Sequence, residues 1–170
     1  KNNNYNNILC DKYRKGHFDG VITVLNKFFT IIKSNKVYFG EKDFQQLKII
    51  EKFIQEKYKS LDLVSVPTKR SEEGIAYSSR NEKLSKKQIQ DFISFHQKVG
   101  NFLKSLDKSF DIETANQKAK DFIVKQEIED LDYFEFRNND DLSFNGTVSE
   151  SRLFYAIYKG KVRLIDNLKV

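Results

Sequence analysis

The strongest constraint on this chain is an ordered pattern of two short apolar runs on either side of a longer amphipathic one. Residues 36–39 form a strand-like run that stops at Gly40, where a turn is expected. Over residues 43–58 apolar side chains recur every three or four positions, which predicts a helix, and Asp43 at its start is expected to bind the first free amides of that helix. Residues 61–66 alternate in part and end at Pro67, the only proline. Strand, helix and strand in this order predict a parallel α/β sheet.

Three more amphipathic stretches are predicted to be helices. One precedes the first strand, with apolar residues spaced by three and four over residues 20–33. Residues 85–88 have the capping-box pattern that begins a helix, and the apolar spacing behind them continues to Leu106. A third stretch runs from about Ile112 to Ile128.

The end of the chain is predicted to hold strands. Strand-like runs cover residues 133–136, 153–158 and 162–165, and turn signals stand at Asn145-Gly146 and Gly160. Helices followed by neighbouring strands are typical of a small α+β unit. We therefore predict two domains: the end of an α/β domain over residues 1–82, and a small α+β C-terminal domain over residues 83–170.

Charge and composition disfavour several kinds of partner. The chain has 170 residues and a net charge of +6, and its lysines are spread along the whole length, often beside Glu or Asp. A nucleic-acid binder is expected to gather its basic residues in a stripe, so no nucleic-acid partner is predicted. A basic RNA-binding domain stays the third hypothesis, and a steep salt dependence of binding would reveal it.

Cysteine and histidine are too few for the common metal and disulfide sites. Cys10 is the only cysteine, and the two histidines, His17 and His96, are far apart in sequence. No intramolecular disulfide is possible, and no metal site is predicted. No apolar stretch has the length of a membrane span and the start does not resemble a signal peptide, so we expect a cytoplasmic protein with no membrane partner.

Three short polar segments could bind an anion. Gly40-Glu41-Lys42-Asp43 joins a strand end to a helix start, where backbone amides, a helix dipole and a lysine can meet a phosphate. Ser78-Ser79-Arg80-Asn81 places two hydroxyls and a guanidinium in one loop. Arg14-Lys15-Gly16-His17 gathers donors before a helix. Taken singly, each segment is more typical of an ordinary polar turn, and a lone histidine is more often structural than catalytic.

Taken together, the residues and the spacing of these segments resemble those of the pantothenate synthetases, also named pantoate–β-alanine ligases. The resemblance extends in order from about Leu9 to the end of the chain. The matching stretches are Gly16-His17-Phe18-Asp19-Gly20-Val21, Phe39-Gly40-Glu41-Lys42-Asp43-Phe44-Gln45-Gln46, Val66-Pro67-Thr68 with Arg70, Gly74-Ile75-Ala76-Tyr77-Ser78-Ser79-Arg80-Asn81, and Gly160-Lys161-Val162-Arg163-Leu164-Ile165-Asp166-Asn167.

The resemblance implies a fold and a reaction. The fold would be a partial Rossmann-like nucleotidyltransferase sheet, of α/β class, followed by the small α+β C-terminal domain. The activity would be that of an ATP-dependent, AMP-forming acid–amine ligase in coenzyme A biosynthesis, which joins pantoate to β-alanine through a pantoyl-adenylate. ATP and Mg²⁺ would be required, and the enzyme would be a homodimer.

The resemblance also implies roles for individual residues. Gln46 would hydrogen-bond pantoate, and Arg14 and His17 would lie at the rim of the substrate pocket. The residues expected to bind ATP are Gly40, Glu41, Lys42, Asp43, Lys69, Tyr77, Ser78, Ser79 and Arg80. The residues expected to act in catalysis, by stabilising charge on the phosphates and the leaving pyrophosphate, are Lys42, Ser78, Ser79 and Arg80.

One part of the family pattern is not found in this sequence. The family carries a His-x-Gly-His motif in its amino-terminal part, and the single histidines at His17 and His96 cannot supply it. We therefore expect the chain to be the C-terminal portion of such an enzyme and to be inactive alone. The alternative is a non-catalytic dimerisation or interaction module derived from that enzyme.

Overall fold

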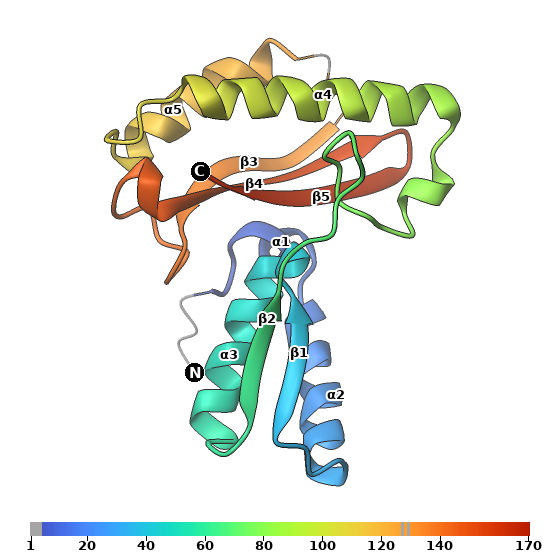
Figure 1. The fold of residues 1–170 in the computed structure, drawn as a ribbon, viewed down its shortest axis with the longest axis vertical. Helices are drawn as coiled ribbons and strands as arrows, with labels where there is room; N and C mark the ends of the chain where they lie inside the picture. The colour runs from blue at the N-terminus through green and yellow to red at the C-terminus, as the bar shows by residue number, and fades with distance from the viewer. Residues whose placement is uncertain (1–4, 127, 129) are drawn as a thin grey trace. The chain divides into compact units, whose positions relative to one another are not determined.

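The computed structural model describes residues 5–126, 128 and 130–170, and the chain divides into two compact units, Lys1–Thr68 and Lys69–Val170 (Figure 1). This division falls earlier in the chain than the predicted domain boundary after residue 82. The reason is that residues 69–82 pack with the C-terminal part of the chain: Arg70 pairs with Asp166, and Ile75 is buried in the core of the second unit. Across the described residues, no helix combines the length and the apolar character that a membrane span requires.

The first unit contains the predicted strand, helix and strand. Two helices precede them, and a 3-10 turn over Glu41–Asp43 links the first strand to the helix behind it. The elements are α1 (Leu9–Tyr13), α2 (His17–Ile31), β1 (Lys36–Gly40), α3 (Phe44–Lys57) and β2 (Asp62–Val66). β1 and β2 pair in parallel, from Lys36 opposite Asp62 to Gly40 opposite Val66. The predicted parallel pairing is confirmed.

One cluster of core residues joins α2, α3 and both strands of the first unit. Its buried members are Ile50, Ile54 and Leu61, and partly buried residues of α2 and both strands pack around them. Phe29 of α2 contacts Tyr58 edge to face, with ring centroids 5.3 Å apart. This packing fastens α2 to the C-terminal end of α3.

The second unit is a three-stranded antiparallel sheet with two helices on one face (Figure 1). The elements are α4 (Lys86–Ser105), α5 (Ile112–Val124), β3 (Asp130–Asn138), β4 (Ser151–Lys159) and β5 (Val162–Lys169), and the strand order is β3-β4-β5. The predicted capping box exists: the Gln88 amide donates to Ser85 Oγ at 3.3 Å, and the Ser85 amide donates to Gln88 Oε1 at 2.9 Å. The predicted α+β organisation is therefore confirmed.

The predicted elements and the observed ones differ in length. α5 ends at Val124, short of the predicted end at Ile128, and residues 127 and 129 lie outside the described part of the chain. All three strands are longer than predicted because main-chain pairing continues through polar positions: Arg137 pairs with Arg152, for example. Gly160, with a φ of +58°, makes the tight β4–β5 turn, in which Lys159 pairs with Val162.

The core of the second unit is larger than that of the first. It joins both helices to all three strands, and its aromatic residues contact one another, as Phe95 and Tyr155 do with centroids 5.6 Å apart. Its fully buried members include Val99, Ile112, Ala115, Ala119, Phe136, Val148, Leu153, Tyr155 and Ile157. A core of this kind lets two helices cover one face of an antiparallel sheet.

Candidate functional site

The segment Gly40–Asp43 lies where both parallel strands end. Gly40, the last residue of β1, is paired with Val66, the last residue of β2, and the 3-10 turn over Glu41–Asp43 follows at once. In α/β sheets ligands bind outside this carboxyl edge. A Cβ built on Gly40 meets nothing within 4 Å, so the space beside the strand end is open.

The backbone of this segment is ordinary, and one expected detail is wrong. Gly40 has a φ of −75°, so no left-handed conformation requires glycine there. Asp43 was expected to bind the first amides of the following helix, yet its side chain makes no capping hydrogen bond to α3. The 3-10 turn sets its backbone at φ −101° and ψ 61°, away from the extended conformation of typical N-caps.

Two adjacent glutamines at the start of α3 have different surroundings. Gln46, the predicted pantoate ligand, is half-buried. Gln45 is buried and fully bonded: its side chain accepts from the Cys10 amide at 2.9 Å and donates to the carbonyls of Tyr5 and Ile8 at 3.0 and 2.9 Å. Gln45 therefore ties the amino-terminal loop to α3, a structural role that the sequence did not reveal.

Arg14 and His17 are brought together at the junction of α1 and α2. The Arg14 guanidinium donates to His17 Nδ1 at 3.2 Å, and Gly16 between them has a φ of +76°. Because an arginine only donates, His17 Nδ1 accepts, and the ring proton then resides on Nε2. The two predicted substrate residues thus form one donor pair with a fixed imidazole.

The segment Ser78–Asn81 is a compact turn in the second unit. The Arg80 amide donates to Ser78 Oγ at 3.2 Å, and the Asn81 amide donates to the Ser78 carbonyl at 3.0 Å. Ser79 is exposed, and the Arg80 guanidinium has no ion-pair partner among the residues that the structure describes. The turn therefore presents a hydroxyl and a cation that an anion could bind.

Lys69 and Tyr77 lie together beside this turn. The Tyr77 amide donates to the Lys69 carbonyl at 3.1 Å, and the Lys69 ammonium lies 5.7 Å from the centre of the Tyr77 ring. The Tyr77 side chain is 56% exposed, which leaves a flat aromatic face accessible. The two predicted nucleotide contacts are thus neighbours in space.

The sequence did not single out a buried polar cluster in this unit. Arg70, His96 and Asp166 converge there, and the Asp166 side chain is only 1% exposed. One signal was available: Asp166 directly follows the strand-like run Val162–Ile165, and a carboxylate that such a strand buries requires a partner. The identity of that partner was not visible from the spacing.

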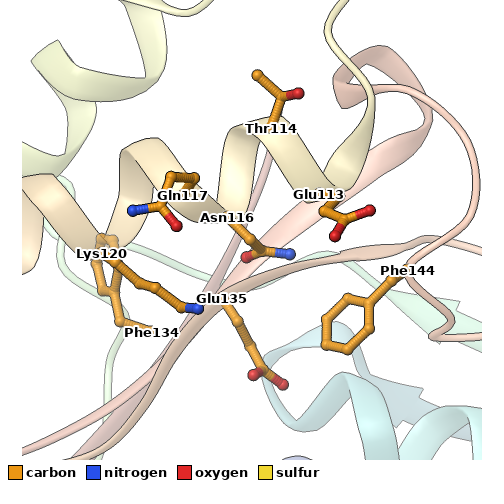
Figure 2. Close-up of a pocket in the computed structure, with 8 residues that line it drawn as sticks. All are labelled: Glu113, Thr114, Asn116, Gln117, Lys120, Phe134, Glu135 and Phe144. Carbon is orange, nitrogen blue, oxygen red and sulfur yellow. The ribbon is translucent and has the colours of Figure 1, made fainter.

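The groove between α5 and β3 contains none of the predicted site residues (Figure 2). It encloses about 590 Å³ and is lined by Glu113, Thr114, Asn116, Gln117, Lys120, Phe134, Glu135 and Phe144. Asn116 bonds both backbone groups of Phe136, donating to the carbonyl at 3.0 Å and accepting from the amide at 2.7 Å. Within the described ranges, no group of three or more acidic, His or Cys side chains could hold a metal ion.

The chain matches known proteins over nearly its whole length. A sequence profile of the family described as pantoate-beta-alanine ligase matches residues 1–169. The pantothenate synthetase of Caldicellulosiruptor bescii is 34% identical over 165 residues, and that of Aquifex aeolicus is 36% identical over 168 residues. In both comparisons 96% of this chain is covered but only 58% of the relative. The chain thus spans well under two thirds of the length of these relatives.

Solved structures agree with the sequence comparisons. The pantothenate synthetase of Thermus thermophilus gives a TM-score of 0.84 at 26% identity, covering 98% of this chain and 60% of that one. The pantoate-beta-alanine ligase of Francisella tularensis, complexed with beta-gamma ATP and beta-alanine, gives a TM-score of 0.71 at 32% identity, covering 99% and 56%. The resemblance noted in the sequence is confirmed, and this chain belongs to the pantoate–β-alanine ligase family.

Proposed function

We propose that this chain is the carboxyl-terminal part of a pantothenate synthetase, which joins pantoate to β-alanine in an ATP-dependent reaction. The observation that carries the proposal is the family match over residues 1–169. The structure of the Francisella tularensis relative, complexed with beta-gamma ATP and beta-alanine, supports the choice of ligands. In the proposed reaction the pantoate carboxylate attacks the α-phosphorus of ATP and pyrophosphate leaves. The uncharged amine of β-alanine then attacks the acyl carbon of the adenylate, the C–O bond to AMP breaks, and the nitrogen loses one proton to solvent as the amide forms.

This reaction requires positioned cations and hydrogen-bond donors more than it requires a side-chain nucleophile. Negative charge grows on the transferring phosphorus and on the leaving pyrophosphate, and pre-placed donors stabilise it. We assign this role to Lys42, Ser78, Ser79 and Arg80. The open space at Gly40 supports the first assignment, and the exposed Ser79 beside Arg80 supports the others. Lys42 belongs to the first unit and the Ser78 turn to the second, and each assignment is argued from its own unit.

The remaining residues are assigned to recognition. Gly40, Glu41 and Asp43 would contact the nucleotide at the end of β1, and Lys69 with Tyr77 would contact it beside the turn. The residues proposed for pantoate and β-alanine are Gln46, Arg14 and His17. The Arg14–His17 hydrogen bond supports their assignment as a pair, because a fixed imidazole and a guanidinium can bind a carboxylate together.

Mg²⁺, the homodimer and the cytoplasmic location belong to the same proposal. Mg²⁺ usually keeps several waters and binds through substrate phosphates, so we propose that it enters the site bound to the phosphates of ATP. Because the chain spans only part of its relatives, we expect the 170-residue chain alone to bind ATP weakly and to form no pantothenate. Pantothenate made by the purified chain alone would contradict this expectation.

Calorimetric titration with ATP and Mg²⁺ tests the nucleotide site. Lys42→Ala and Arg80→Ala are each expected to raise the Kd about tenfold, which corresponds to a loss of ~1.4 kcal/mol. Lys104→Ala, which changes an exposed lysine in the last turn of α4, is the matched control and is expected to leave the Kd unchanged. If Lys104→Ala weakens ATP binding as much as the other two, the binding is non-specific attraction to a basic protein and the assigned site is wrong.

One observation favours the alternative of an interaction module. α2 presents a second apolar stripe outside the core: the side chains of Val24, Phe28 and Ile31 are 50%, 51% and 77% exposed. A module that only self-associates would use such a surface. Sedimentation showing a tight dimer, together with calorimetry showing no nucleotide binding, would favour this alternative over the ligase.

A further inference from the structure

The segment that carries the Ser78 turn is not part of either sheet. It is a small hairpin in the second unit, closed by a bridge between Arg70 and Ala76 and turning at Gly74, which has a φ of +88°. Its backbone bonds join it almost wholly to itself: the Ser71 amide donates to the Ile75 carbonyl at 2.9 Å, and the Tyr77 amide donates to the Lys69 carbonyl. Side chains must therefore set where the hairpin lies.

The Arg70 side chain makes the polar attachment, in addition to Ile75, which is buried in the core of the unit. Its guanidinium donates to both carboxylate oxygens of Asp166 on β5, at 2.7 and 3.0 Å. It also donates to the Gly74 carbonyl at the tip of the hairpin and to the Asn167 carbonyl on β5, each at 3.0 Å. The planar guanidinium fork of Arg70, at the base of the hairpin, thus binds the hairpin tip and the sheet at the same time. A lysine cannot reproduce this geometry.

The Asp166 carboxylate, which accepts the hydrogen bonds of Arg70, is surrounded by groups from three elements. Asp166 Oδ1 accepts from the Asn167 amide at 2.8 Å, and Oδ2 lies 3.5 Å from the Tyr155 hydroxyl on β4. His96 of α4 lies with Nδ1 3.2 Å from the same hydroxyl and 3.9 Å from Asp166 Oδ2. With β4, β5 and α4 all contributing, the position of the carboxylate is fixed by the core of the unit.

The tip of the hairpin fits closely against this cluster. A Cβ built on Gly74 would stand 3.2 Å from His96 Nε2, which is tighter than ordinary contact. Close approach and a positive φ together require glycine at this position. The hairpin is therefore located both by the Arg70 fork and by contact with His96.

The Ser78–Asn81 turn is connected to the hairpin by a side-chain hydrogen bond. The Asn81 side chain donates to the Ala76 carbonyl at 3.0 Å, two residues before the turn begins. The Arg80 and Asn81 amides both bond Ser78, so the turn holds its own shape. A displacement of the hairpin would therefore displace Ser78, Ser79 and Arg80 as one body.

We propose that Arg70 and Asp166, supported by His96 and Tyr155, are positioning residues that set the Ser78–Arg80 turn in place for the phosphates of a nucleotide. This inference rests on the proposed function, because the phosphates are those of the proposed ATP site. None of the four residues needs to touch the ligand. Their effect passes through the hairpin backbone and the Asn81–Ala76 hydrogen bond.

The first test measures the turn without any ligand. In Arg70→Lys, which keeps the charge and loses the fork, amide hydrogen exchange at Arg80 and Asn81 is expected to rise about tenfold while amides within α4 keep their protection. Arg163→Lys is the matched control, since Arg163 lies on the same strand, β5, and pairs with Asp132 of β3 at 2.6 Å. Unchanged exchange at the turn in a folded Arg70→Lys protein would overturn the proposal, as would a uniform rise across the whole unit.

The second test is a double-mutant cycle on nucleotide affinity. Arg70→Lys is expected to raise the Kd for ATP with Mg²⁺ about tenfold, and to raise it no further when Arg80→Ala is already present, because residues acting through one another are not additive. Asp166→Asn should behave like Arg70→Lys. Fully additive effects would overturn the positioning role. If the unaltered chain binds no ATP, the proposed function fails, while the exchange measurement still decides whether Arg70 places the turn.

Discussion

The first unit packs α2 and α3 onto two parallel strands, whereas the second packs α4 and α5 onto three antiparallel strands. In the first unit Tyr38 on β1 is 66% exposed, and the buried apolar side chains of its described residues are Leu9, Phe18, Phe44, Leu47, Ile49, Ile50, Ile54 and Leu61. In the second unit the core includes all three strands and buries Tyr155 completely. Parallel sheets are normally covered on both faces, and antiparallel sheets are stable with one face open. Among the described residues, the first unit therefore buries fewer apolar side chains than the second.

The two candidate phosphate segments differ in the same way. Gly40–Asp43 follows directly from main-chain pairing of β1 with β2, and any residue able to extend the strand would keep it there. Ser78–Asn81 is connected to a hairpin whose position depends on the side chains of Arg70 and Asp166. The first segment should therefore tolerate substitutions in its neighbourhood better than the second.

The largest expected effect is the loss of core packing in the second unit. Phe136→Ala removes a fully buried ring and is expected to cost about 3–5 kcal/mol in the free energy of unfolding of that unit. Urea denaturation, followed by hydrogen exchange of each unit, would measure it. Phe28→Ala in the first unit, at a side chain 51% exposed, is the control and should cost far less. Equal losses would mean that the two units do not differ as described.

Glycine substitutions should act in opposite directions in the two units. Gly74→Ala places a methyl group 3.2 Å from His96 in a left-handed backbone, and is expected to cost about 1–3 kcal/mol. Gly20→Ala, inside α2 with nothing within 4 Å of the new methyl group, should stabilise the first unit by about 0.5–1 kcal/mol. Thermal unfolding of both variants would check the two signs, and a stabilising Gly74→Ala would remove the reason for a glycine beside His96.

The stability of the second unit should also depend on pH through His96. Burial lowers the pKa of His96 below its usual 6.5, although the charge of Asp166 raises it in part. The unfolded chain then takes up a proton at higher pH than the folded one, so stability is lost as the pH falls below about 6.5. Arg70 and the Tyr155 hydroxyl also face this ring, and burial holds the tyrosine pKa well above its usual value, so Tyr155 stays protonated throughout.

The measurement is the unfolding free energy of His96→Gln between about pH 7 and pH 5, compared with the unaltered chain. The variant should show a smaller slope over this interval. Carboxylates whose pKa is lowered by local hydrogen bonds, such as Asp111 and Glu150, lose their contribution only at lower pH. An identical slope in both proteins would show that His96 is not the group that responds.

The smallest expected effect lies on the exposed stripe of α2. Ile31→Gln changes a side chain that is 77% exposed, and should alter the free energy of unfolding by no more than about 0.5 kcal/mol. Sedimentation of the same variant measures any self-association through this surface. A large loss of stability would mean that the stripe is packed, and the contrast in burial between the units would then be smaller than described.

Much of the fold could be predicted because it depends on neighbours in sequence. The spacing of apolar residues predicted α3 and α4, and the pair Ser85 and Gln88 predicted the start of α4. Strand ends were less predictable, since pairing through polar positions such as Arg152 depends on the partner strand. The division of the chain after Thr68 depends on packing, which sequence spacing does not show.

The candidate site divides in the same manner. The Ser78 turn and the Arg14–His17 pair are local, and the sequence placed both. Gln45 and Gln46 are adjacent and identical in type, so only their surroundings show that Gln45 is a structural tie. The position of Asp43 suggested a helix cap, but the intervening 3-10 turn prevents one.

The sequence by itself determined the family of this protein and the order of strand, turn and helix, because motif residues and apolar periodicity act over a few positions. Tertiary structure alone decided that Arg70 reaches Asp166, which lies 96 positions away, and that His96 and Tyr155 complete the cluster. The physical reason is that a buried carboxylate is stable only where its surroundings supply charge and hydrogen bonds, and those surroundings exist only after the chain has folded.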